Sequence, residues 1–352
     1  MMYDFIIVGA AQAGLSMAYE LEQIDANYLV LDKEDEIGAS WLNRWDSLKL
    51  FTPTEFNHLE GLDFPAPKGH YPNKYEVADY FKTYVNTFDI PVQLNTLVES
   101  IYKKDGIFIL ETENQTFTSH NVVVATGPFH IPYTPPFYKK ISSSVRQWHS
   151  NFYKNPDQLQ DGDCLVVGAG DSGFQILDEI SATGETTYFS GKTQVQTLPQ
   201  EFLGKTLWWW FTKTGYLSID KNTWLGKQVS HSKQPVIGVD VKEILKRKNV
   251  IPVGKTIDAE GVIITTKDKT IKGIKNIVWA TGYRPNFNWI QGLELDKEGY
   301  PVHHRGVSNT KGLYFIGLPW LHTRGSATLG GIKKDADYLI NAIAEAYKLA
   351  LY

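Results

Sequence analysis

Short apolar runs that lead into glycine-rich turns and then into amphipathic helices recur along the chain. One such unit starts at residues 4–8, turns through residues 9–14 and ends in a strand at residues 28–31. A second unit starts at residues 164–167 and turns through residues 168–173. Strands that alternate with helices in this way are typical of α/β folds with parallel sheets. The pattern predicts an α/β protein with two Rossmann-like dinucleotide-binding domains.

A repeated strand ending indicates how the two domains are connected. Two further apolar strands end in Ala-Thr-Gly, at residues 125–127 and 280–282. The prolines within residues 132–136 stiffen the chain after the first of these strands, which favours a domain joint there. The second domain is therefore predicted to be inserted into a discontinuous first domain. The predicted bounds are 1–148 and 278–352 for the first domain, 149–277 for the second, and 199–235 for a tryptophan-rich insert that the pattern leaves unassigned.

The first glycine-rich turn has the composition of a pyrophosphate cradle. Small residues let the backbone approach a ligand closely, and a helix that begins there offers free amide donors to an anion. Asp32 follows the next strand at the distance where a carboxylate accepts hydrogen bonds from two ribose hydroxyls. A tight turn without a ligand is the alternative. The predicted cofactor contacts of this turn are Gly9, Ala10, Ala11, Gln12, Ala13, Gly14, Asp32 and Lys33.

The second turn carries a complete dinucleotide fingerprint, but a different sequence follows it. The strand predicted at residues 186–189 runs into Ser190 and Lys192, with no carboxylate at its end. A carboxylate there repels the 2′-phosphate of NADPH, whereas a lysine and a serine can bind it. NADPH is therefore favoured, and NADH stays the alternative. The predicted contacts are Gly168, Gly170, Asp171, Ser172, Gly173, Ser190 and Lys192.

Two cradles in one chain imply two dinucleotides that are used together. FAD suits the first cradle, because Asp32 matches its unphosphorylated ribose, and a nicotinamide dinucleotide then occupies the second and exchanges hydride with the flavin. The sequence has one cysteine, Cys164, which excludes a redox-active cysteine pair and a cysteine-based zinc cluster. The electrons are therefore expected to pass to dioxygen or to a diffusible small molecule.

Composition and charge narrow the partners further. Of 352 residues, 35 are Lys or Arg and 39 are Asp or Glu, a formal charge of −4 that favours no binding to nucleic acid. Hydrophobic residues make up 42% and charged residues 21%, as in ordinary globular proteins. We recognise no targeting segment and no apolar stretch long enough to span a bilayer, so a cytoplasmic location is expected.

Several short motifs follow the first turn in a set order. They lie at residues 38–41, 45–53, 71–72, 279–283, 312–317 and 326–331. By these motifs the chain resembles the class B flavin monooxygenases, above all their small bacterial members, the plant auxin-forming enzymes and flavoproteins associated with cation-diffusion facilitators. The resemblance implies an FAD-dependent, NADPH-using monooxygenase that forms a flavin C4a-hydroperoxide. A small soft nucleophile, such as a thioether or an amine, or a ketone, then takes one oxygen atom.

The resemblance also implies roles for individual residues. Leu48, Leu50, Phe51 and Thr52 are expected to line the isoalloxazine, with Phe51 and Thr52 nearest to the chemistry. His149 is assigned to domain positioning. The other implied cofactor contacts are Ser40, Trp41, Val98, Thr126, Gly127, Thr281, Gly282, Gly317, Ala327, Thr328 and Leu329.

Departures from the family pattern keep other functions open. Phe51 stands where many relatives carry a polar residue, and an apolar side chain cannot hydrogen-bond a hydroperoxide. Ser143 and Val145 replace the phenylalanine and glycine of the family fingerprint. One alternative is an NAD(P)H oxidase that releases hydrogen peroxide, and another is a flavin-bound accessory or sensor protein linked to metal efflux. No metal site is predicted, and a homodimer that uses the tryptophans at 208–210 stays open.

Overall fold

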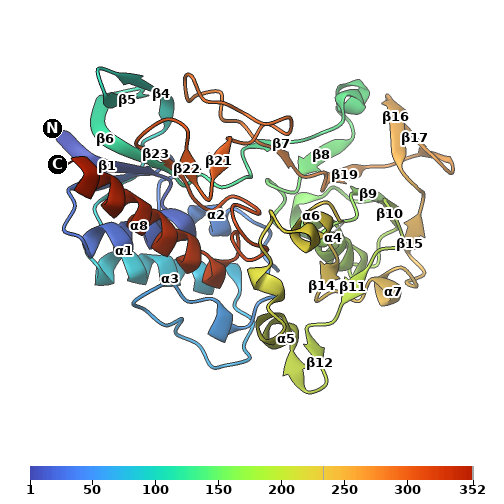
Figure 1. Ribbon diagram of the computed structural model, residues 1–352. Helices are drawn as coiled ribbons and strands as arrows, with labels where there is room; N and C mark the ends of the chain where they lie inside the picture. Colours follow the sequence, from blue (N-terminus) through green and yellow to red (C-terminus); the bar gives the residue numbers. More distant parts are fainter. Residues whose placement is uncertain (233, 351–352) are drawn as a thin grey trace.

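Two sheets, one mixed and one parallel, form the framework of the computed structural model, which describes residues 1–232 and 234–350 (Figure 1). The strands of the first sheet are β1 (Met2–Val8), β2 (Tyr28–Leu31), β3 (Val92–Gln93), β4 (Val98–Lys104), β5 (Ile107–Thr112), β6 (Thr116–Val124), β21 (His303–His304), β22 (Val307–Ser308) and β23 (Leu313–Phe315). Its parallel centre has the order β3-β2-β1-β6-β23, and β4 and β5 continue from β6 as an antiparallel meander. Alternate residues of β1 serve opposite faces: Phe5 and Ile7 join one apolar cluster, and Ile6 and Val8 join the other.

The second sheet repeats the parallel centre of the first. Its strands are β8 (Arg146–His149), β9 (Cys164–Val167), β10 (Thr187–Ser190), β15 (Val250–Pro252) and β19 (Asn276–Trp279). All neighbours are parallel, in the order β15-β10-β9-β19-β8. A small antiparallel sheet packs its apolar residues against one face of these strands. It consists of β16 (Thr256–Glu260), β17 (Ile263–Thr266) and β18 (Thr270–Lys272).

Helices cover one face of each sheet. The first sheet carries α1 (Gln12–Glu22), α3 (Lys74–Thr87) and α8 (Lys333–Ala350), and the second carries α4 (Asp171–Ser181) and α7 (Val241–Ile244). α3 begins at a capping box, in which Asn73 and Glu76 accept hydrogen bonds from each other's backbone amides. The predicted fold class is confirmed, and we call the two halves the first and the second unit. None of the helices in the described ranges combines the length and apolar character needed to cross a membrane.

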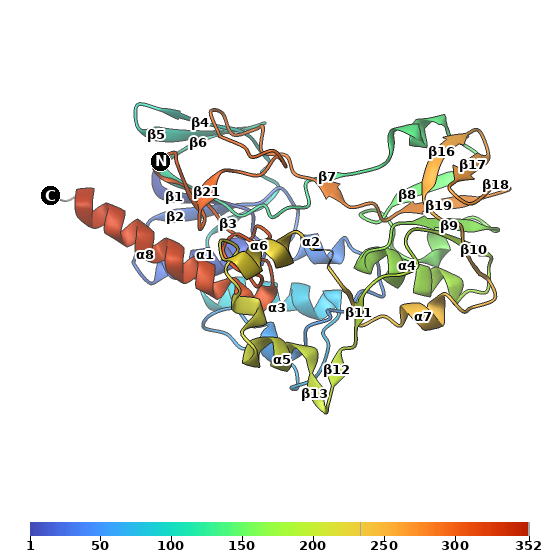
Figure 2. The same ribbon diagram turned by 45° about the vertical axis from the view of Figure 1, so that its right-hand side comes forward.

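Two linkers that lie side by side join the units (Figure 2). β7 (Ile131–Pro132) leads into the second unit and β20 (Tyr283–Arg284) leads out of it, and the two pair antiparallel. The predicted joints at 148/149 and 277/278 fall inside β8 and β19, because both strands pair within the second sheet. The second unit therefore starts and ends a few residues outside the predicted bounds.

The insert at 199–235 leaves the second unit and crosses to the first. It contains β12 (Glu201–Phe202), β13 (Lys205–Thr206), α5 (Leu207–Lys213) and α6 (Trp224–Ser230), and it returns through β14 (Val236–Ile237), which pairs with β11 (Thr197–Leu198). On the way it binds residues 316–332, which connect β23 to α8 and are here called the C-terminal loop of the first unit. The amide of Arg324 donates to Ile219 and that of Gly325 to Leu217, at 3.1 and 2.9 Å. The insert is thus a strap between the units.

Asp335, in the first turn of α8, is a buried carboxylate with incomplete hydrogen bonding. The residue is 2% exposed, and its Oδ2 has no hydrogen-bond partner among the described residues. Burial raises the pKa of Asp335 to about 6, although Ser326, Arg305 and Lys221 favour the charged form.

Asp335→Asn is expected to stabilise the protein at pH 8 but not near pH 4. Because the folded-state pKa lies above the ordinary value of 3.8, the wild type has its full stability below about pH 4 and loses stability as the pH rises from there through about 6. The gain should reach about 3 kcal/mol at pH 8, since one pKa unit corresponds to about 1.4 kcal/mol. Urea unfolding between pH 4 and 8 measures it, with the more exposed Asp337→Asn as the control. A gain that does not depend on pH contradicts the prediction.

Candidate functional site

Each glycine-rich turn packs against the carbonyl group of an Ala-Thr-Gly alanine. Gly9 has a φ of +111° and Gly168 a φ of +131°, a region that favours glycine. A Cβ on Gly9 would lie 2.8 Å from the Ala125 carbonyl oxygen, and one on Gly168 would lie 2.1 Å from that of Ala280. The repeated motif therefore closes the back of a turn in both units. The turns and helix starts comprise the predicted Gly9, Ala10, Ala11, Gln12, Ala13, Gly14, Gly168, Gly170, Asp171, Ser172 and Gly173.

The helices that follow the turns begin with free backbone amides. The N-cap residues Ala11 and Gly170 share an extended conformation, with φ of −89° and −96° and ψ of −172° and −176°. Within the described structure neither helix has a side-chain cap, so its first amides are available to a pyrophosphate. No described atom outside its own chain neighbours lies within 4 Å of a Cβ built on Gly170, which explains why alanine is accepted at position 11. Asp171 turns its carboxylate to the Ile237 amide, at 3.1 Å.

Backbone hydrogen bonds establish which positions of the two units correspond. The Gly9 amide donates to the carbonyl of Leu31 at 2.8 Å, and the Gly168 amide donates to that of Ser190 at 2.9 Å. Leu31 and Ser190 therefore occupy the same place, as the last residues of β2 and β10. The residue that follows each of them lies where a cofactor ribose is recognised in this kind of fold.

These following residues differ in charge. Asp32 accepts hydrogen bonds from the amides of Ala10, at 2.5 Å, and Glu34, at 2.9 Å, which hold its carboxylate at the first turn. Its counterpart in the second unit is Gly191, which has no side chain. Lys192 comes next and is exposed. The ribose position of the first cradle thus holds the Asp32 carboxylate. The corresponding position of the second cradle holds Gly191, which is uncharged, and Lys192 follows it.

Ser190 is not available to a phosphate, which corrects our prediction. The residue is 2% exposed, and its hydroxyl accepts hydrogen bonds from the amide and the hydroxyl of Thr256, at 2.8 and 2.7 Å. Because Ser190 corresponds to Leu31, it belongs to a buried strand and not to the loop. Lys192 remains the predicted phosphate ligand.

Asn57, which sequence reasoning missed, fixes the segment that is predicted to face the flavin. Its Oδ1 accepts a hydrogen bond from the Thr52 hydroxyl at 2.5 Å, and its amide donates to the carbonyls of Thr52 and Pro53, at 2.8 and 3.2 Å. The side chains of Thr52 and Asn57 are both buried. The Phe51 ring stacks on Trp208 of the insert, with ring centres 5.8 Å apart, and the Trp208 indole donates to the Phe51 carbonyl. A single asparagine carries no periodic signal, so only the folded chain reveals its role.

The other residues predicted beside the flavin divide between the two units. Leu50 is buried in the core of the first unit, and Trp41 packs against the same cluster. Leu48 packs instead against the core of the second unit. Contact of these side chains with an isoalloxazine therefore stays a prediction. It has less support for Leu48, which packs in the second unit, than for Leu50 and Trp41.

Some of the remaining predicted contacts lie at the first turn or at the linkers. A Cβ on Gly317 would lie 2.7 Å from that of Ala13, so the C-terminal loop abuts the start of α1. The Thr126 hydroxyl hydrogen-bonds the His130 ring at 3.0 Å. Thr281 donates to the Tyr133 carbonyl. The other residues are the buried Val98 and Leu329, the half-buried Gly127 and Thr328, and the exposed Lys33, Ser40, Gly282 and Ala327.

His149 joins the second sheet to the outgoing linker. Its Nε2 hydrogen-bonds the Gly282 carbonyl at 3.0 Å, and its Nδ1 accepts from the Asn151 amide at 3.1 Å. Burial, aided by the charge of Arg44, lowers the pKa of His149. A neutral ring with its proton on Nε2 satisfies both bonds, which agrees with a role in domain positioning.

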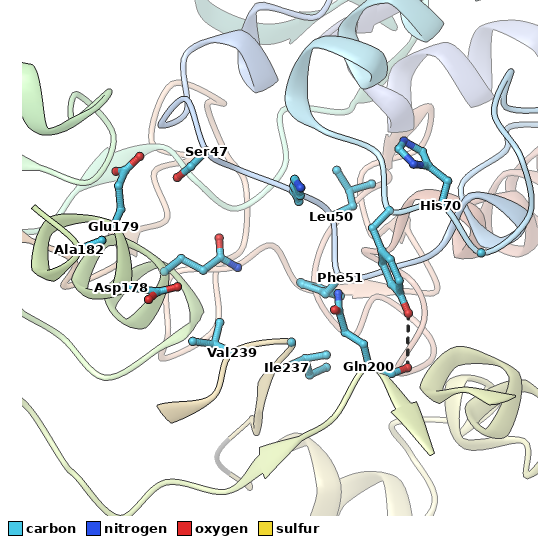
Figure 3. A pocket seen from close by; sticks show the side chains of 15 residues that line it. Ser47, Leu50, Phe51, His70, Asp178, Glu179, Ala182, Gln200, Ile237 and Val239 are labelled. Carbon is cyan, nitrogen blue, oxygen red and sulfur yellow. Dashed lines mark hydrogen bonds between the residues drawn. The ribbon is translucent and has the colours of Figure 1, made fainter. Parts of the chain in front are cut away.

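A cavity of about 650 Å³ lies between the units (Figure 3). Leu50, Phe51 and Tyr71 line it from the first unit, and Gln175, Ile237 and Val239 line it from the second. Its volume is in the range of small-molecule sites. The cavity therefore adjoins the segment that is predicted to face the flavin.

The single cysteine is buried in a strand. Cys164 is buried in β9, and burial raises the pKa of its thiol far above the ordinary value. Among the described residues no group of three or more His, Cys, Asp or Glu side chains could hold a metal ion.

Known proteins are similar to this chain in sequence and in fold. The family model described as pyridine nucleotide-disulphide oxidoreductase matches residues 6–202. The chain belongs to this family. An uncharacterized CzcO-like oxidoreductase of Geobacillus kaustophilus is 43% identical over 97% of this chain and 98% of its own length. YUCCA7 of Arabidopsis thaliana, a probable indole-3-pyruvate monooxygenase, is 27% identical over 97% of this chain and 88% of its own.

Solved structures of flavin enzymes share the fold. A flavin-containing monooxygenase of Stenotrophomonas maltophilia has a TM-score of 0.81 at 23% identity, and the match covers 98% of this chain and 99% of that one. A complex of OTEMO with FAD and NADP has a TM-score of 0.74 at 14% identity, over 99% and 86%. Together with the relatives, they confirm the family resemblance that the motifs indicated. Within this family the present chain has a single, buried cysteine, so it lacks a dithiol.

Gly168→Ala and Gly170→Ala form a matched pair of variants for the second turn. Gly168→Ala is expected to destabilise the second unit by about 3 kcal/mol, because it combines a positive φ with a backbone clash. Gly170→Ala should leave the folded protein within about 0.5 kcal/mol of the wild type, since its Cβ meets open space. Thermal and urea unfolding compare the two. Equal stabilities contradict the assigned geometry.

Proposed function

We propose that this chain is an NADPH-dependent, FAD-containing monooxygenase that oxygenates a small soft nucleophile, a thioether or an amine, or a ketone. The observation that carries the proposal is the pair of equivalent cradles on separate sheets, one with Asp32 at its ribose position and the other with Gly191 and Lys192. The OTEMO complex, which has the same fold, contains both dinucleotides.

The residues present fit two dinucleotides. The first cradle would hold FAD, with its pyrophosphate at the amides of α1 and its ribose at Asp32. The second would hold NADPH, with its pyrophosphate at the amides of α4 and its 2′-phosphate at Lys192. Bound flavin supplies the redox chemistry, since it accepts hydride from the nicotinamide and passes electrons to dioxygen.

The chain itself contributes placement and exclusion of water. Asn57 holds the Thr52 segment, and Trp208 covers Phe51 from the insert. A substrate that enters the cavity between the units meets the apolar side chains of Leu50, Ile237 and Val239, and also charged ones, among them Lys49, Asp178 and Glu179. Exclusion of water where Trp208 covers Phe51 would favour transfer of oxygen to the substrate over loss of peroxide to water.

One observation favours an NAD(P)H oxidase as the second candidate. The Phe51 ring offers no hydrogen bond, and the Thr52 hydroxyl is bound to Asn57. Neither side chain is therefore free to stabilise an oxygen adduct.

Product analysis distinguishes the two candidates. The protein is reduced anaerobically with NADPH and mixed with aerated buffer that contains methyl phenyl sulfide, a tertiary amine or a cyclic ketone. The proposal predicts that most NADPH yields oxygenated product and that the flavin spectrum passes through a state distinct from the reduced and oxidised forms. One hydrogen peroxide per NADPH with every compound, and no such state, identifies the oxidase.

Lys192→Glu tests the cofactor assignment. Replacing the cation by an anion is expected to raise the KM for NADPH about 10- to 100-fold, because a charge-assisted phosphate contact is lost, and to leave the KM for NADH within about threefold. Steady-state NAD(P)H oxidation measures both constants. Lys272→Glu, an exposed residue of β18, is the control. An unchanged NADPH to NADH preference contradicts Lys192 as the phosphate ligand.

A further inference from the structure

Residues 42–48, here called the joint loop, reach from the first unit into the second. Trp45 is 5% exposed and lies in the apolar core of the second unit, together with Tyr153 and Phe174. The Asp46 amide donates to the Lys154 carbonyl at 2.7 Å, and the Asp46 carboxylate accepts from the Asn155 side chain at 2.7 Å. The loop therefore belongs to both units at once.

A buried lysine gives the joint loop its shape. Lys74 of α3 is 1% exposed. Its ammonium group donates to the carbonyls of Leu42 and Arg44, at 3.0 and 2.7 Å, and to the Asp46 carboxylate at 2.7 Å. All three donor positions of the ammonium group are thus used within the loop. The backbone of Arg44 is held from the first unit, while its side chain is free to reach outward.

The Arg44 side chain binds the outgoing linker and the second unit. Its guanidinium donates to the Tyr283 hydroxyl at 2.6 Å and to Asn151 Oδ1 at 3.4 Å, and the same hydroxyl donates to Asn151 at 3.1 Å. The guanidinium carbon also lies 5.4 and 5.6 Å from the ring centres of Phe129 and Tyr283. These two aromatic residues follow the Ala-Thr-Gly motifs of the first and second units. Arg44 therefore connects the points where the chain leaves each sheet.

We propose that Arg44 is a positioning residue that sets the orientation of the two units for hydride transfer. The proposal rests on the two-cofactor arrangement proposed above, in which each unit holds one dinucleotide. Hydride transfer needs the reacting atoms about 3–3.5 Å apart and aligned, and an error of about 1 Å can cost 100-fold in rate. The paired linkers and the insert also restrain the two units, and Arg44 of the joint loop adds a restraint at the points where the chain leaves each sheet.

The first test is anaerobic stopped-flow reduction of the FAD-loaded protein by NADPH. Arg44→Lys should reduce the rate constant of flavin reduction about tenfold and Tyr283→Phe about as much, while the dissociation constant of NADPH changes less than threefold. The double variant should be little slower than either single one, because both remove the same contact. Arg247→Lys, whose ion pairs lie within the second unit, is the control. Additive losses, or a rate within twofold of wild type, overturn the proposal.

The second test does not depend on turnover. Hydrogen exchange of residues 129–135 and 281–285 in the FAD-loaded protein should accelerate at least fivefold in Arg44→Lys, because these linkers lose an anchor, while α3 and β9 exchange as in the wild type. Unchanged linker exchange overturns the proposal. If NADPH does not reduce the wild type, the proposed function fails, and the exchange result still decides whether Arg44 restrains the linkers.

Discussion

A carbonyl oxygen that leaves no space for a side chain determines the shape of both nucleotide cradles. Ala125 and Ala280 bring this oxygen against Gly9 and Gly168, and each contact joins the turn after the central strand of a sheet to the end of the neighbouring strand. The turn can then start a helix whose amides face outward. Because both units contain the contact, both present an anion-binding helix start at the same edge of the sheet. The difference in charge at the ribose position lies in the residues that follow the next strand, Asp32 in the first unit and Gly191 and Lys192 in the second.

The two units are held together by exchanged segments more than by their linkers. The joint loop sends Trp45 into the core of the second unit, and the insert sends residues 217–221 to the C-terminal loop of the first. The joint loop also lines the cavity between the units through Ser47, and Phe51, which lines the same cavity, stacks on Trp208 of the insert. A change in orientation between the units must therefore disturb the cavity and the joint loop together.

Elements with buried strands and glycine turns could be predicted from the sequence, and contacts between distant segments could not. The strands at 28–31 and 164–167 agree with prediction because apolar residues and turn signals bound them closely. The strand after the second turn lies one residue later than expected, at Thr187–Ser190, and this shift takes Ser190 out of the phosphate site. The roles of Asn57 and Arg44 could not be predicted, because the role of a polar residue depends on hydrogen-bond partners that only the fold brings together. For Arg44 the partner Tyr283 is 239 positions away.

The paired linkers make the second unit a module whose two ends meet. Such a module can be gained, lost or exchanged in evolution without breaking the first sheet, since the chain enters and leaves at one place. The strap limits this freedom, because residues 217–221 carry surface that matches residues 322–325 of the host. A chimera that takes its second unit from a relative must therefore take residues 217–221 and residues 322–325 from the same parent protein.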